Sequence, residues 1–356
     1  MTEAASLSAY GWDDHWSDRL DALRASAAGE VDGSRPGRVV RHDGAGLVVA
    51  TAEGAVRAMF GPAVDPPPVV GDWILLDRRG TPQATLARDS LLRRRAAGGE
   101  REQPLVANVD VVLAVCGLDR PVRTGRIERT VTIALDAGAE SIVVLTKADR
   151  VEPSTAAEAA LVVAEVDPTL PVVTLSAKGG WGVDGLLGLV AGRTLALIGE
   201  SGAGKSTLVN ALMAADVAAE GDVRTGDAKG RHTTTHRELH LLVGGGVLVD
   251  TPGLREVGIW TDPDSVAETF ADIDELAGGC RFRDCAHEAE PGCAVLAAVA
   301  EATLSSERVE RWRALETEAA STALRADAVE YRRRSRQGGR IAREAQQAKD
   351  DQRHGR

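Results

Sequence analysis

Short apolar runs broken by turns characterise residues 36–100. Residues 37–60 contain two β-branched runs separated by glycine-containing turns, and residues 69–77 contain a third run. Pro62 and Pro66 to Pro68 interrupt the pattern between them. Several short strands in such a length are typical of a small β-barrel. We therefore expect an OB-type barrel, with an SH3-like barrel as the alternative.

Longer apolar runs alternate with helical stretches from residue 101 onward. Runs that predict strands recur at residues 110–119, 141–149, 170–178, 193–199, 236–243 and 245–253. Stretches that predict helices lie between the earlier runs, at residues 125–139, 154–166, 182–190 and 204–213. Continuous apolar strands alternating with helices are typical of a parallel, doubly wound α/β sheet.

One segment matches the phosphate-binding pattern G-x-x-x-x-G-K-[ST] without a mismatch, and it lies between a predicted strand and a predicted helix. Glycines let backbone N–H groups turn toward phosphate oxygens, and the helix N-terminus adds its dipole. Lys205 is expected at the β- and γ-phosphates, and Ser206 as a ligand of Mg²⁺. The predicted nucleotide-binding residues here are Gly199, Glu200, Ser201, Gly202, Ala203, Gly204, Lys205, Ser206 and Thr207.

Two downstream segments suit the γ-phosphate side of such a site. Asp250 ends an apolar run and Gly253 follows in a turn, which is typical of a Mg²⁺-side aspartate and a γ-phosphate sensor. Residues 230–236 are rich in glycine and threonine and have neither helical nor strand character. Thr234 is our candidate for completing the Mg²⁺ shell, with Thr233 and Thr235 as alternatives.

Two further segments suggest how the base is recognised. Thr146, Lys147 and Asp149 close one predicted strand, and Ser176, Ala177 and Lys178 close the next. A carboxylate at Asp149 can accept both the N1–H and the exocyclic amine of guanine, which adenine does not offer. The usual guanine motif begins with Asn, so we expect Thr146 to brace the site less firmly.

The order of these motifs is permuted, because both base-reading segments precede the phosphate loop. Relocated chain ends at the surface allow the strands to keep the same places in the fold. The sequence therefore predicts a circularly permuted nucleotide-binding domain specific for GTP and GDP.

Three of the four cysteines fall within residues 280–293. Cys280, Cys285 and Cys293, together with His287, form a Cys₃His set that suits a closed, structural Zn²⁺ site. Cys116 lies in an apolar run and is expected to be a small core residue.

Composition narrows the class of protein. The chain has 44% hydrophobic and 27% charged residues, and we found neither an apolar run long enough to cross a membrane nor a basic N-terminal signal. We expect a cytoplasmic protein without membrane contact. The net charge of −11 argues against a surface that binds nucleic acid everywhere. The basic runs at Arg93 to Arg95 and at residues 331–356 are either RNA contacts or solvated segments.

The permuted motifs, the preceding barrel and the cysteine cluster together resemble the small ribosomal subunit biogenesis GTPase RsgA family. Segments 230–239, 250–260 and 280–295 are similar to that family's signature segments. The resemblance implies binding to the 30S ribosomal subunit and its 16S rRNA late in assembly, with GTP hydrolysis stimulated by the subunit and coupled to release. We expect a monomer. An rRNA-binding scaffold that uses GTP only as a conformational ligand is the alternative, and an ATP-using enzyme is disfavoured by Asp149.

The resemblance also implies a multidomain α/β architecture. We expect an N-terminal helical extension at residues 1–35, an OB-type barrel at 36–100, a circularly permuted P-loop GTPase domain at 101–260, a helical zinc-binding domain at 261–325 and a basic tail at 326–356. Leu254 replaces the glutamine that often orients the attacking water. His232 is our candidate for that catalytic role, with His236 behind it.

Overall fold

The computed structural model describes residues 7–26, 33–42, 46–59, 64–95, 102–217, 237–242, 244–250, 263–321 and 324. The chain divides into two compact units. One comprises residues 1–93 and 104–257, and the other comprises residues 94–103 and 258–356. Within the described ranges, no helix is both long and apolar enough to cross a membrane.

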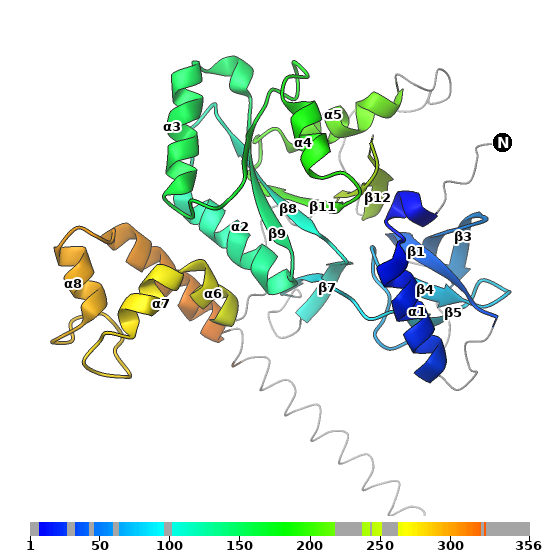
Figure 1. The fold of residues 1–356 in the computed structure, drawn as a ribbon, viewed down its shortest axis with the longest axis horizontal. Coiled ribbons are helices and arrows are strands. Elements are labelled where there is room, and N and C mark those ends of the chain that lie inside the picture. Colours follow the sequence, from blue (N-terminus) through cyan, green and yellow to red (C-terminus); the bar gives the residue numbers. More distant parts are fainter. Residues whose placement is uncertain are drawn as a thin grey trace, which may run out of the picture. The chain divides into compact units, whose positions relative to one another are not determined.

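The N-terminal part of the first unit is an antiparallel sheet (Figure 1). Its strands pair in the order β3-β2-β1-β4-β5. Their bounds are Arg35–His42 for β1, Gly46–Thr51 for β2, Gly54–Met59 for β3, Trp73–Leu76 for β4 and Pro82–Thr85 for β5. The described residues show no pairing between β3 and β5, so closure into a barrel stays a prediction.

The 3₁₀ helix η1 (Leu7–Tyr10) and the helix α1 (Asp14–Ser26) share a hydrophobic core with this sheet. Trp12 meets the Trp73 ring edge-on, with ring centroids 4.8 Å apart, and Trp16 lies 5.9 Å from the same ring. Edge-to-face contacts of this kind stabilise aromatic clusters beyond the area that they bury. The N-terminal segment is therefore an integral part of the first unit.

The same sheet continues, through the antiparallel pairing of Arg41 with Glu238, into the strands that carry the nucleotide-binding motifs. These strands follow the order β10-β9-β8-β11-β13-β12. Their bounds are Val111–Gly117 for β8, Glu140–Thr146 for β9, Val172–Thr174 for β10, Thr194–Gly199 for β11, Glu238–Leu241 for β12 and Val247–Asp250 for β13. The predicted parallel sheet is right for all of them except β12, which runs antiparallel to β13. The two are joined by a short turn, whereas a parallel pair needs a crossover of about a dozen residues or more.

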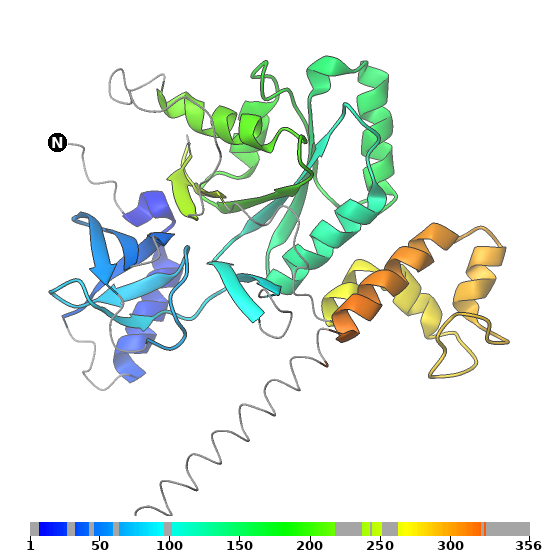
Figure 2. The ribbon, with the colours of Figure 1, turned by 180° about the vertical axis from the view of Figure 1, so that it is seen from behind.

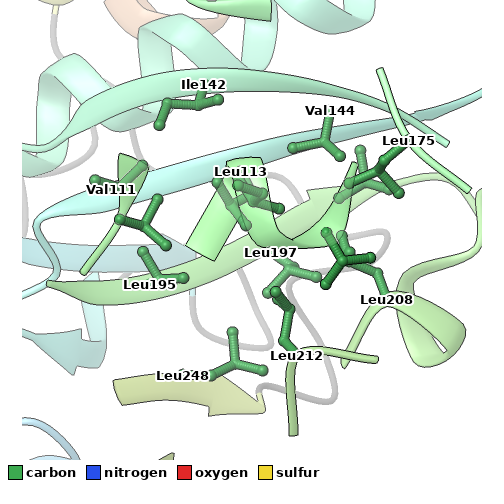
Figure 3. Close-up of a cluster of buried hydrophobic side chains, with 14 of the residues drawn as sticks. Val111, Leu113, Ile142, Val144, Leu175, Leu195, Leu197, Leu208, Leu212 and Leu248 are labelled. Carbon is green, nitrogen blue, oxygen red and sulfur yellow. The ribbon is translucent and has the colours of Figure 1, made fainter. Parts of the chain in front are cut away.

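Helices cover both faces of this region, as Figure 1 and the reverse view in Figure 2 show. Helices α2 (Thr124–Ala137) and α3 (Pro153–Ala164) pack on one face. Helices α4 (Val183–Leu189) and α5 (Lys205–Val217) pack on the other. Figure 3 shows part of the hydrophobic cluster that the sheet shares with these two helices. The labelled residues are Val111, Leu113, Ile142, Val144, Leu175, Leu195, Leu197, Leu208, Leu212 and Leu248.

Arg38 on β1 connects the N-terminal sheet to the strand that leads into the phosphate loop. Its side chain is 2% exposed and lies against the Trp73 ring. The guanidinium donates to the carbonyls of Gly71, Tyr10 and Asn108 and, at 2.9 Å, to the hydroxyl of Thr194 at the start of β11. Burial lowers the pKa of Arg38 to about 10, so the group remains charged at neutral pH.

Strands β6 (Leu91–Arg95) and β7 (Glu102–Ala107) form a separate two-stranded sheet. The first arginine of the basic run in β6, Arg93, pairs with Asp136 of α2 at 2.8 Å, and the two side chains are 18% and 3% exposed. At least this arginine therefore contributes to packing of the first unit.

The second unit has its own helical core (Figure 1). Its helices are α6 (Pro263–Thr269), α7 (Ala271–Ala277), α8 (Ala294–Ala300) and a helix over residues 306–321. The largest fully buried side chain of this core is Phe270, which lies between α6 and α7. The loop between α7 and α8 contains the cysteine cluster.

Candidate functional site

The phosphate loop leaves β11 at Gly199 and enters α5 at Lys205. A Cβ on Gly199 would lie 2.3 Å from the carbonyl oxygen of Val115 on β8, so only glycine permits this close approach. Gly204 has a φ of +91°, which residues with a side chain rarely adopt. The sequence motif thus produces a tight turn at the carboxyl end of β11, where ligands bind in open α/β sheets.

Lys205 lies over the start of this loop. Its ammonium group donates to the carbonyls of Gly199 and Glu200, and its side chain is only 8% exposed. Ser206 and Thr207, in the first turn of α5, are exposed. The loop therefore presents a cation and two hydroxyls at a helix N-terminus, the arrangement that suits a phosphate with its Mg²⁺.

The first base-reading segment is in direct contact with the phosphate loop. The Thr146 hydroxyl donates to the carbonyl of Ala203 at 2.5 Å, and Thr146 is 1% exposed. The Lys147 ammonium donates to the carbonyl of Gly202 at 2.5 Å. Lys147 has a φ of +63°, an uncommon conformation for a residue with a long side chain. The structure thus brings together motifs that are far apart in the sequence.

The second base-reading segment is coupled to the first through Asp149. The Ser176 hydroxyl donates to the Asp149 carboxylate at 2.6 Å, and this hydrogen bond lowers the pKa of Asp149 below its ordinary value. Ser176 also accepts from the N–H of Gly179 at 3.0 Å. Ala177 follows Ser176, and Lys178 is exposed. Asp149 is thereby oriented and kept ionised, as an acceptor of two guanine N–H groups requires.

Three charged residues near the phosphate loop were missed by the sequence analysis. Asp119 accepts from the Lys147 ammonium at 2.6 Å, which lowers the pKa of the Asp119 carboxyl. Arg126, in the first turn of α2, pairs with the Glu200 carboxylate at 2.5 Å. Arg120 lies within 3.4 Å of Glu200 and 3.5 Å of Asp119. Asp119 and Arg120 follow the carboxyl end of β8, and that position was a usable signal.

The described residues do not include His232, Thr233, Thr234, Thr235, His236, Gly253 and Leu254. Asp250 is the last residue of β13, where its backbone pairs with Glu238. The placement of its side chain is outside the described part. The predictions for the γ-phosphate side and for water positioning therefore remain predictions.

In the second unit, Cys280, Cys285, His287 and Cys293 converge, with all four ligand atoms within 4.8 Å of one another. The Cys280 Sγ lies 3.9 Å from the Cys293 Sγ and 3.5 Å from the His287 Nδ1, which is 3.3 Å from the Cys293 Sγ. Zn–S bonds of about 2.3 Å in a tetrahedron separate two sulfurs by about 3.8 Å. The four residues therefore fit a zinc ion.

Backbone N–H groups donate to two of these sulfurs. Ala294 donates to the Cys280 Sγ at 3.3 Å, and Leu296 donates to the Cys293 Sγ at 3.4 Å. Burial opposes ionisation of Cys280, but the hydrogen bond from Ala294 and others outweigh it and lower the pKa of that thiol, whereas burial raises the pKa of Cys285 to about 11. Thiolates are the form that binds zinc.

Comparison with known proteins agrees with this geometry. Residues 85–260 match the family described as RsgA GTPase. A Streptomyces coelicolor protein named small ribosomal subunit biogenesis GTPase RsgA is 44% identical over 360 residues, covering 97% of this chain and 96% of that protein. A protein of the same name from Streptomyces avermitilis is 40% identical, covering 96% and 94%.

Solved structures confirm the permuted fold. YjeQ from Thermotoga maritima matches with a TM-score of 0.61 and 25% identity, covering 80% of this chain and 98% of that one. YloQ, described as a circularly permuted GTPase, matches with a TM-score of 0.58 and 23% identity, covering 82% and 96%.

Proposed function

The chain belongs to the RsgA GTPase family and is a GTP-hydrolysing enzyme, and from this premise we propose that it acts on the maturing 30S ribosomal subunit. There it hydrolyses GTP to GDP and phosphate, and hydrolysis is coupled to its release. The names of the relatives support a role in biogenesis of the small subunit.

One observation supports a single guanine-nucleotide site most directly. Thr146 and Lys147 of the base-reading segment both donate to backbone carbonyls of the phosphate loop. A nucleotide whose base is held by Asp149 therefore has its phosphates directed toward Lys205. Thr146 takes over the bracing role that asparagine has in the usual motif.

The chemistry of each group follows from its position. Asp149 accepts from the guanine N1–H and amine, and the segment Ser176 to Lys178 provides the second side of the base site. Gly199 to Gly204 surround the phosphates with backbone N–H groups, and Lys205 neutralises the β- and γ-phosphates. Bound Mg²⁺ supplies further charge neutralisation, and Ser206, Asp250 and Thr234 are the residues proposed to hold it.

Hydrolysis also requires an oriented water molecule. Leu254 has no polar side chain, so a different residue must accept this role. We assign it to His232, whose imidazole can hydrogen-bond a water at neutral pH. Gly253 is the proposed sensor of the γ-phosphate. An enzyme with these features hydrolyses GTP slowly by itself and faster on the ribosomal subunit.

Contacts with 16S rRNA belong to the N-terminal sheet and the second unit in this proposal. The strand order β3-β2-β1-β4-β5 suits an OB-type barrel, whose surfaces often bind nucleic acid. The Cys₃His cluster holds one structural Zn²⁺ that shapes the loop between α7 and α8. The protein acts as a monomer.

Single-turnover hydrolysis of GTP, measured with and without 30S subunits, tests the proposal. We expect a faster chemical step with 30S subunits and no acceleration with 50S subunits. Binding to 30S particles without any acceleration would instead indicate a scaffold for which GTP is only a conformational ligand. Preference for ATP over GTP in a competition experiment would contradict the assigned base site.

A further inference from the structure

Arg120 lies beside the phosphate loop, although it belongs to no nucleotide-binding motif. It follows β8 by three residues, and its guanidinium is 3.2 Å from the position that a Cβ on Gly202 would occupy. The carbonyl of the same Gly202 accepts from Lys147 of the base-reading segment. Arg120 therefore lies next to the part of the loop that faces the base site.

The carboxylates near Arg120 have shorter contacts with other cations. Asp119 is 2.6 Å from the Lys147 ammonium but 3.5 Å from Arg120. Glu200 is 2.5 Å from Arg126 but 3.4 Å from Arg120. The Arg120 side chain is 43% exposed. Of the cations at these carboxylates, Arg120 is thus the one held most weakly, and reorienting it breaks no short hydrogen bond.

Glu200 is the second residue of a loop that binds an anion, so the negative charge of its carboxylate must be neutralised by a nearby cation. Arg126 supplies it and also ties the loop to the first turn of α2. With Glu200 neutralised by Arg126, Arg120 adds positive charge beside the phosphate loop. Such charge attracts a polyphosphate, and a guanidinium forms strong, charge-assisted hydrogen bonds with phosphate oxygens.

We propose that Arg120 is a further nucleotide-binding residue, which contacts the diphosphate part of the bound guanine nucleotide beside Gly202. The inference rests on the nucleotide site of the proposed function and extends it. Because the carbonyl of Gly202 accepts from the base-reading Lys147, we expect the contact to involve the α- and β-phosphates, which GDP and GTP share. Arg120 therefore raises the affinity for GDP and for GTP by the same factor. The Glu200–Arg126 pair holds the loop in place while Arg120 reorients.

Equilibrium binding of GDP and GTP to the nucleotide-free full chain tests the proposal. We expect Arg120→Ala to lower the affinity for both nucleotides by about tenfold, the loss typical of one charge-assisted hydrogen bond. Arg120→Lys should recover part of this affinity, since it keeps the charge but loses the planar donor pair. Arg123→Ala, which removes an exposed arginine from the same segment, is the matched control and should bind as the wild type does. The preference for GDP over XDP should stay unchanged in every variant, because Asp149 is intact.

A second measurement separates direct contact from an effect through Glu200. In a Glu200→Gln background, Arg120→Ala should still cost about tenfold in GDP affinity if Arg120 contacts the nucleotide itself. Loss of the effect in that background would overturn the proposal, as would wild-type affinity in Arg120→Ala or a loss confined to GTP. These outcomes are independent of 30S stimulation. Failure of the wild type to bind GDP would contradict the proposed function instead.

Discussion

The Thr146 hydroxyl donates a hydrogen bond of 2.5 Å to the carbonyl of Ala203, a residue 57 positions further along the chain. Thr146 ends β9 and Ala203 follows β11, and in the sheet only β8 lies between these two strands. Their contact depends on the order of strands in the sheet and not on their order in the chain. Permutation of the motifs therefore leaves the base-reading segment in contact with the phosphate loop.

Replacement of Thr146 tests this contact. Thr146→Val keeps the shape but leaves the Ala203 carbonyl without this donor, so we expect about 1–3 kcal/mol less stability and weaker GDP binding. Thr146→Ser keeps the hydroxyl and should lose less. Urea unfolding and GDP titration measure both effects. Equal stability and affinity in Thr146→Val and the wild type would show that the hydroxyl does not brace the loop.

Arg38 should be important for the stability of the first unit. Arg38→Met leaves several buried carbonyls and the Thr194 hydroxyl without their charged donor. Because each buried acceptor left unsatisfied costs about 1–3 kcal/mol, we expect a loss of about 3–5 kcal/mol in total. Arg41→Met, on the same strand, removes only a half-exposed pair with Glu238 and should cost at most about 1 kcal/mol. Unfolding followed by tryptophan fluorescence suits this comparison, because Trp73 adjoins Arg38. A similar loss in both variants would contradict the assigned role.

Zinc removal should act on the second unit and spare nucleotide binding. Cys293→Ser removes one of four ligands, so we expect loss of bound zinc and of the cooperative unfolding of this unit. Cys116→Ala is the matched control, because Cys116 lies in β8 of the first unit. Metal content and hydrogen exchange of α7 and α8 provide the readouts. Retention of one zinc per chain in Cys293→Ser would exclude the proposed ligand set.

Local sequence pattern was sufficient for the elements around the phosphate loop. The run from Leu195 to Ile198 is apolar and buried, and the motif after it specifies both the turn and the helix. The hydrogen bonds that Thr146 and Lys147 donate to the phosphate loop could not be predicted, because they depend on which strands become neighbours in the sheet. The same holds for Arg38, whose partners come from segments on either side of it and up to 156 positions away.

The ion-pair partners of charged side chains also could not be predicted from the sequence. Arg93 looked like a surface cation, but its partner Asp136 lies on a helix more than 40 positions later. β12 looked like the other apolar strands, and only the short turn to β13 determines its antiparallel direction.

The cysteine cluster was predictable because its ligands are close in sequence.

His232 is the proposed water-positioning residue, and its replacement tests that assignment. We expect His232→Ala to lower 30S-stimulated turnover by about 100-fold, the typical contribution of a positioned acid–base group, with little change in GTP affinity. His240→Ala, in β12, is the matched control and should keep turnover. If His232→Ala retained stimulated turnover, another residue would have to orient the water.

The base preference of turnover in Asp149→Asn tests most directly that the permuted segments form one guanine-specific catalytic site. Asparagine offers an N–H donor in place of one carboxylate oxygen, which suits the 2-oxo group of xanthine and not the amine of guanine. We predict that this variant hydrolyses XTP in preference to GTP and that 30S subunits still stimulate it. Unchanged preference for GTP would contradict the account.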